Sequence, residues 1–131
     1  SGGGWATTVY PALDTRITKS FSIAGSLPLS LRNIIDDVGD YEQYNPGFYS
    51  IASYLDIYIM SSSGFDRQHI QIFNKHDPCC FAGENSLYAF DSIQQSVDQF
   101  NSSNFEIIID DTHNEHKISD STIDFIIQKL S

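Results

Sequence analysis

The sequence has little of several features that mark well-known protein classes. Only two of its 131 residues are cysteine, and these are the neighbours Cys79 and Cys80. Adjacent Cα atoms lie about 3.8 Å apart, whereas a disulfide usually spans about 4.4–6.8 Å. We therefore expect free thiols, an intermolecular bond or metal ligation at these two positions. Because the chain has no other cysteine, the disulfide-dense class of small secreted domains is excluded.

Basic residues are also scarce, since 7 Lys and Arg stand against 17 Asp and Glu and give a net charge of -10. Phosphate backbones and anionic lipid surfaces repel such a chain, so we predict no nucleic-acid partner. Repulsion among crowded carboxylates raises their pKa values, which predicts greatest stability at about pH 4–5. No run of about 18 apolar residues occurs, so we predict no transmembrane segment.

Recognisable catalytic and phosphate-binding motifs are missing as well. The opening run Ser1-Gly2-Gly3-Gly4 is interpreted as a tag remnant or a processed N-terminus, and it is expected to precede no helix. The other glycines are isolated, so no loop is expected to cradle a phosphate. We expect no cofactor, and we predict that the protein is not an enzyme.

The residues that are present suffice for one packed domain, because 40% of them are hydrophobic. We predict a single α+β domain over 1–131, in which 1–14 is an extended or irregular segment. Alternation of apolar residues predicts strands at 15–23, 51–60, 69–74 and 105–110, and helical periodicity predicts helices at 27–38, 87–100 and 120–130. This order predicts a ferredoxin-like split βαβ sandwich. It has a four-stranded antiparallel sheet, helices on one face and an extra C-terminal helix.

Histidines and cysteines gather after the last two predicted strands. In the split βαβ arrangement these strands run parallel with the first strand between them, so the loops that follow them meet at one end of the sheet. The loops hold the candidate metal ligands His76, Cys79, Cys80, His113 and His116. Zinc prefers such ligands, but their spacing matches no tight zinc motif, so no metal site is favoured. A thiol or metal-dependent enzyme that uses this loop end is the third hypothesis for function.

The segment 39–50 is rich in aromatic residues. Four of them, Tyr41, Tyr44, Phe48 and Tyr49, could pack onto the domain or form an exposed contact surface. Aromatic side chains are typical anchors of interfaces. We therefore predict that these four residues bind a protein or a cell-surface target.

The predicted element order over about residues 15–131, the acidic balance and the N-terminal run together give a family resemblance. The chain resembles the secreted killer toxins of yeasts and fungi that have a ferredoxin-like α/β-sandwich fold. The resemblance implies a secreted, non-catalytic toxin or effector that binds a target-cell surface or membrane component. It carries over no site residue, because no family motif is matched. The alternative hypothesis is an intracellular or viral ferredoxin-like module that binds a protein.

Overall fold

The computed structural model describes residues 2–32, 39–82, 87–101 and 104–131. The helices and strands of this part are, in chain order, α1 (Gly2–Leu13), β1 (Lys19–Ile23), a 3-10 turn (Leu29–Leu31), a second 3-10 turn (Tyr41–Gln43), α2 (Pro46–Tyr49), α3 (Tyr54–Ser62), β2 (Gln68–Asn74), α4 (Leu87–Asn101), β3 (Phe105–Asp110) and α5 (Asp120–Leu130).

The described strands form one parallel sheet in the order β1-β2-β3. Lys19 pairs with Gln68 at the start of β1, and Asn74 pairs with Asp110 at the end of β3. Helix-containing crossovers join the strands, as parallel pairing requires. The predicted ferredoxin-like, four-stranded antiparallel sheet is therefore wrong. The last two strands do run parallel as predicted, but they are direct neighbours, and β1 does not lie between them.

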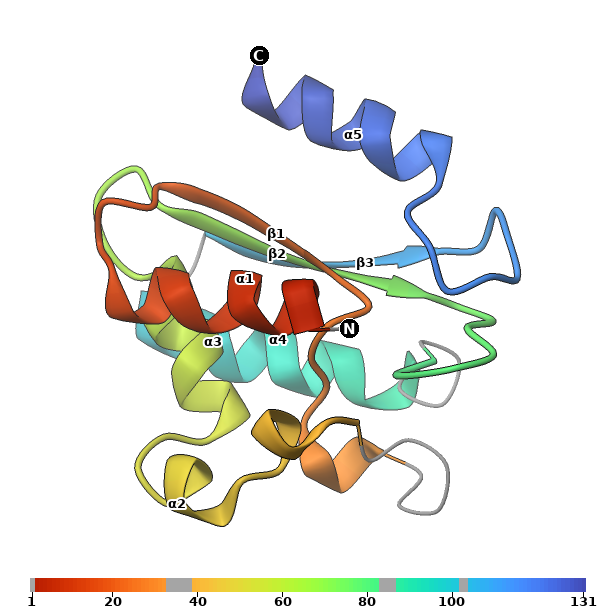
Figure 1. Ribbon diagram of the computed structural model, residues 1–131. Coiled ribbons are helices and arrows are strands. Elements are labelled where there is room, and N and C mark those ends of the chain that lie inside the picture. Colours follow the sequence, from red (N-terminus) through yellow and green to blue (C-terminus); the bar gives the residue numbers. More distant parts are fainter. Residues whose placement is uncertain (1, 33–38, 83–86, 102–103) are drawn as a thin grey trace.

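Helices cover both faces of the sheet. Figure 1 shows α1, α3 and α4 on one face and α5 on the other. The prediction that helices lie on one face is therefore wrong, whereas the additional C-terminal helix is confirmed as α5. In Figure 1 the C-terminal ends of β2 and β3 and the start of α1 lie at one end of the molecule. Ligand sites of parallel α/β sheets lie at this end of the strands.

The predicted strand 51–60 is instead helical from Tyr54 onward, as part of α3. Leu55, Ile57 and Ile59 alternate as in a strand, but the residues that α3 buries include Tyr54, Ile57 and Tyr58, which follow the helical period. A capping box starts the helix, because the Ser53 hydroxyl accepts the Asp56 N–H and the Asp56 carboxylate accepts the Ser53 N–H.

The predicted irregular segment 1–14 is helical from Gly2 to Leu13. The run of glycines allows the helix to touch the backbone after β1, because a Cβ on Gly4 would lie 2.5 Å from the Cα of Gly25. The prediction that this run precedes no helix is therefore wrong. Low helix propensity is overridden here by tertiary packing.

The remaining elements match the sequence more closely. The strands at 69–74 and 105–110 and the helices at 87–100 and 120–130 are confirmed within one residue at each end. The strand at 15–23 is confirmed over its last five residues. Of the predicted helix 27–38, residues 29–31 form a 3-10 turn and 33–38 lie outside the described residues.

Two apolar clusters fill the space between the sheet and the helices α3 and α4. One contains Leu27, Phe73 and Phe81, and the other contains Tyr54, Tyr58, Val97 and Phe105. Under β1 and β2 the interior is polar, and hydrogen bonds join its side chains. The members of this polar network are Thr8, Ser20, Ser22, Ser26, Tyr58, His69 and Gln71.

Candidate functional site

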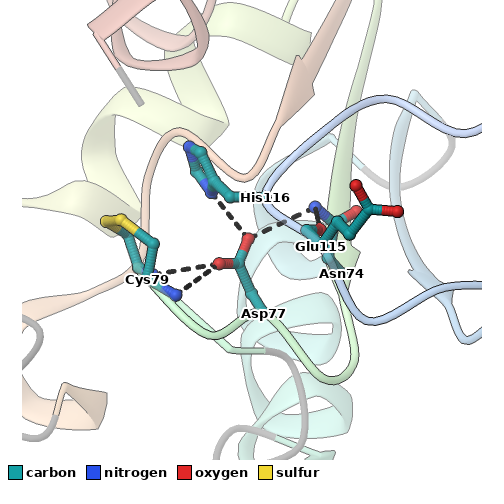
Figure 2. The surroundings of a disulfide bond; sticks show 6 residues. Asn74, Asp77, Cys79, Glu115 and His116 are labelled. Carbon is teal, nitrogen blue, oxygen red and sulfur yellow. Dashed lines mark hydrogen bonds and ion pairs between the residues drawn. A yellow bond between two sulfur atoms is a disulfide. The ribbon is translucent and has the colours of Figure 1, made fainter.

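The register of the sheet brings two loops together. Asn74 and Asp110 are partners at the last position of β2 and β3, so the loops that follow them leave the sheet side by side. The side-chain amide of Asn74 ties the loops to each other, since its Nδ2 donates to the carbonyl oxygens of Glu115 and Lys117. The second loop is thus fixed over the first (Figure 2).

A carboxylate–imidazole pair lies between these loops. His116 Nδ1 is 2.7 Å from Asp77 Oδ2, and the Asp77 side chain is fully buried. The N–H groups of Cys79 and Cys80 donate to Asp77 Oδ1 at 2.9 and 3.1 Å. Burial acts to raise the pKa of Asp77. The hydrogen bonds from the Cys79 N–H, His116 and the Cys80 N–H outweigh burial, so the pKa lies below its ordinary value.

This pair has the geometry of a general base and its orienting group. A carboxylate at Nδ1 places the imidazole proton on that nitrogen, so that Nε2 is the ring nitrogen that accepts a proton. His116 is about one-third exposed, so its ring reaches solvent. It also lines a hollow of about 470 Å3 whose wall includes Gly3 and Gly4 at the start of α1. His116 therefore shares a hollow with the N-terminal end of a helix, where backbone N–H groups favour developing negative charge.

A second histidine at this edge is placed differently. His113 Nε2 lies 3.7 Å from Asp110 Oδ2, beyond hydrogen-bond distance. Asp110 instead accepts hydrogen bonds from the hydroxyl groups of Ser119, Thr112 and Thr122, which anchor the start of α5. Burial opposes these bonds, but they hold the pKa of Asp110 far below its ordinary value. Asp110 therefore anchors the start of α5, and the geometry for proton transfer belongs to Asp77 and His116.

The two cysteines form a disulfide with each other. The expectation of free thiols, an intermolecular bond or metal ligation is wrong for this state of the protein. Of the five candidate ligands, Cys79, Cys80 and His116 come together, with one ligand atom of each within 4.8 Å of the others. His76 and His113 are not part of that group. The described ranges contain no other cluster of His, Cys, Asp and Glu side chains that could hold a metal ion.

The four aromatic residues of segment 39–50 lie apart from this edge, around α2. Tyr49 is tied into the domain, because its hydroxyl accepts the Trp5 Nε1–H and lies 2.9 Å from the Tyr54 hydroxyl. Phe48 is half-buried against Trp5. Tyr41 and Tyr44 are exposed and contact each other edge to face. Packing thus accounts for two of the four, and their predicted role in binding stays a prediction.

Asp77 was missed as a site residue by sequence reasoning. It was one acidic residue in a polar loop, and 39 positions separate it from His116. The available signal was the strand order, because polar residues after two parallel strands meet at one edge of a sheet.

Among the described residues, no helix is both long and apolar enough to cross a membrane.

No protein-family model matches the sequence. No curated protein matches it either. A solved structure is similar in fold: the crystal structure described as "Putative Dienelactone Hydrolase" from Klebsiella pneumoniae superposes with a TM-score of 0.58 at 14% sequence identity. The match covers 99% of this chain and 47% of that chain, so the chain spans about half the length of its structural neighbour.

This likeness extends over nearly the whole chain and concerns the fold alone. It agrees with the parallel sheet covered by helices on both faces and points to an α/β hydrolase-like architecture. The resemblance to killer toxins is therefore wrong, because it rested on a split βαβ order that the protein lacks. The prediction of a non-catalytic protein loses its basis with it.

Proposed function

We propose that the protein is a hydrolase that cleaves an ester through a serine nucleophile. Ser1 is the proposed nucleophile, His116 the general base and Asp77 the group that orients His116. The observation that carries the proposal is the 2.7 Å contact between His116 Nδ1 and the buried Asp77, at the C-terminal ends of neighbouring parallel strands. Two different loops have to be positioned together to produce this contact.

The sequence supports Ser1 as the nucleophile. Ser1 itself lies outside the described residues, so its role is argued from its neighbours. Ser1-Gly2-Gly3 fits the last three positions of the G-x-S-x-G turn, in which the serine precedes a helix. The helix α1 begins at Gly2. The chain order Ser1, Asp77, His116 is also the order of the triad in α/β hydrolases.

The structural neighbour supports the class of reaction. That protein is described as a dienelactone hydrolase, and a lactone is a cyclic ester. In the proposed reaction the Ser1 hydroxyl attacks the ester carbonyl and His116 Nε2 takes its proton. The leaving alcohol departs with that proton, and water then cleaves the acyl-enzyme with the same base. The Gly2 N–H, which follows the nucleophile, is a donor for the oxyanion.

A covalent probe tests this proposal without knowledge of the natural substrate. A fluorophosphonate reacts with an activated serine, because the serine oxygen displaces fluoride from phosphorus. We expect mass spectrometry of the full-length protein to find the adduct on Ser1. Labelling should be lost in Ser1→Ala and His116→Ala and kept in the matched controls Ser50→Ala and His113→Ala.

Hydrolysis of short-chain p-nitrophenyl esters provides the second measurement. Loss of a member of the proposed triad should lower kcat/KM by at least about 1,000-fold, whereas both controls should retain it. Labelling and hydrolysis that persist in Ser1→Ala would overturn the proposal.

A further inference from the structure

The disulfide between Cys79 and Cys80 lies beside the proposed base. One ligand atom of each cysteine and one ring nitrogen of His116 lie within 4.8 Å of one another. Figure 2 shows the sulfur atoms and the imidazole on the same side of Asp77. Cys79 is exposed and Cys80 is half-buried, so a reductant or an ion can reach the sulfur atoms from solvent.

The loop that carries the cysteines is held independently of the bond between their sulfur atoms. Asp77 Oδ1 accepts the backbone N–H groups of both cysteines. The next residue, Phe81, is fully buried with a positive φ of 60°, and the Arg32 guanidinium lies 4.5 Å from its ring centre. A bulky residue keeps such a backbone conformation only where its surroundings enforce it. Opening the disulfide should therefore leave both thiols beside His116.

We propose that reduction of this disulfide creates a metal site in which Cys79, Cys80 and His116 bind Zn²⁺. Two thiolates and one imidazole, with water in the fourth position, are a zinc ligand set that proteins use. Around a tetrahedral zinc ion, ligand atoms lie about 3.6–3.8 Å apart, from Zn–S and Zn–N distances of about 2.3 and 2.0–2.1 Å. The three ligand atoms lie within 4.8 Å of one another, and rotation of the cysteine side chains after the S–S bond opens has to bring them to this spacing. Asp77 is the carboxylate that zinc-bound histidines usually have on their second ring nitrogen.

The reaction balances with a dithiol as the reductant. The dithiol gives two electrons and two protons to the disulfide and becomes a disulfide itself, while Cys79 and Cys80 become thiols. Zn²⁺ then displaces one proton from each thiol, so two Zn–S bonds form and two protons are released. A disulfide oxidant takes two electrons from the two thiolates and becomes two thiolates itself, which restores the Cys79–Cys80 bond, removes both thiolate ligands and releases the ion.

The consequence for catalysis rests on the proposed function. An imidazole that binds zinc cannot take a proton from Ser1. Reduced protein with zinc should therefore be inactive, and reduced protein without zinc should be active. The site would make hydrolysis depend on both the redox state and the zinc supply of the surroundings.

The test measures zinc binding directly. The full-length protein is reduced with a phosphine, freed of metal and titrated with Zn²⁺ against a chromophoric chelator. We expect one equivalent to bind, and no comparable binding by the oxidised protein. Cys79→Ser, Cys80→Ser and His116→Ala should each weaken binding by at least about tenfold, whereas the matched control His113→Ala should not.

Ester hydrolysis is followed in the same samples. Zinc should abolish hydrolysis in the reduced protein, and a chelator should restore it. In Cys79→Ser, the rate of hydrolysis with zinc should equal the rate without it. The inference is overturned if the reduced protein binds no zinc, or if binding ignores the cysteine replacements. Zinc binding with the expected residue dependence, in a protein that shows no hydrolysis without metal, would uphold the metal site and count against the proposed function.

Discussion

The Nδ1 atom of His116 lies 2.7 Å from the Oδ2 atom of Asp77, and the two residues come from different strand-end loops. The pair forms because β2 and β3 are parallel neighbours and end together at Asn74 and Asp110. A carboxylate in this position fixes the tautomer of a catalytic histidine.

Replacement of Asp77 by asparagine should lower kcat strongly while the protein stays folded. The asparagine oxygen can still accept the N–H groups of Cys79 and Cys80, but its NH2 group would face His116 Nδ1. The imidazole proton would then move to Nε2, which could no longer act as a base. We expect a loss of about 100- to 10,000-fold in ester hydrolysis. The exposed Asp111→Asn is the matched control, and equal activities in the two variants would contradict the assignment.

Sequence patterns predicted the last two strands, α4 and α5 because each of these elements has one clear period. They failed at 51–60, where Leu55, Ile57 and Ile59 alternate while Tyr54, Ile57 and Tyr58 also follow a helical period. The deciding signal was local: Ser53 and Asp56 form the capping box. Only the correct assignment of this helix gives an all-parallel sheet.

The candidate site could be predicted in part. The inference that the loops after the last two strands meet at one end was right, because those strands are parallel. The partner of His116 could not be identified, since its selection depends on the hydrogen bonds of Asn74 across the two loops. The run Ser1-Gly2-Gly3-Gly4 was misjudged because glycine normally disfavours helices, whereas contact with Gly25 requires it here.

Gly4→Ala should destabilise the protein, and its neighbour provides a matched control. The added Cβ would lie 2.5 Å from the Gly25 Cα and 2.7 Å from the Ile23 carbonyl oxygen, so backbone would have to move. We expect a loss of about 1–3 kcal/mol in the free energy of unfolding, as for other overpacked sites. Gly3→Ala meets nothing within 4 Å and should be neutral or stabilising by up to about 1 kcal/mol. Urea denaturation measures both, and equal losses would show that α1 does not dock closely.

Tyr49→Phe should also destabilise the protein, although only one oxygen atom is removed. The Trp5 Nε1–H would lose its acceptor, and the Tyr54 hydroxyl would lose a neighbour at 2.9 Å. We expect a loss of about 1 kcal/mol, the usual net contribution of a hydrogen bond, because these groups are only partly buried. Tyr41→Ala, at an exposed position, should change stability by no more than about 0.5 kcal/mol. The opposite order of losses in urea denaturation would mean that the surface residue carries the structural role.

The lowered pKa of the buried His69 predicts how the free energy of unfolding depends on pH. Burial, with a smaller contribution from the charge of Arg67, lowers the pKa of His69 to about 3. The ring is neutral in the folded protein, since Gln71 Nε2 donates to its Nε2 and its Nδ1 lies 2.6 Å from the Ser20 hydroxyl. Tyr58 and Phe105 are the aromatic residues that stack on it. None of these four neighbours has a carboxylate that would stabilise a charged ring.

The sign of the effect follows from proton linkage. Below its ordinary pKa of about 6.5, histidine binds a proton in the unfolded chain but not in the folded one, so stability falls as pH drops from there towards 3. One such group changes the free energy of unfolding by up to about 1.4 kcal/mol per pH unit. Asp110 acts in the same direction at lower pH, because its lowered pKa gives stability that is lost as the carboxyl is protonated.

His69 and Asp110 both lower the free energy of unfolding as the pH falls. Their effect is opposite to that of carboxylate repulsion, which alone would predict a stability maximum at about pH 4–5. Every described carboxyl group with a shifted pKa is shifted downward: Asp14, Asp56, Asp77, Asp110 and Glu115. At each of these positions hydrogen bonds or ion pairs lower the pKa by more than burial raises it. We expect a higher free energy of unfolding at pH 7.5 than at pH 4.5, measured by urea denaturation. His69→Gln should flatten the slope between about pH 5 and 6.5. Greater stability at pH 4.5, or an unchanged slope in His69→Gln, would show that the buried histidine does not govern this dependence.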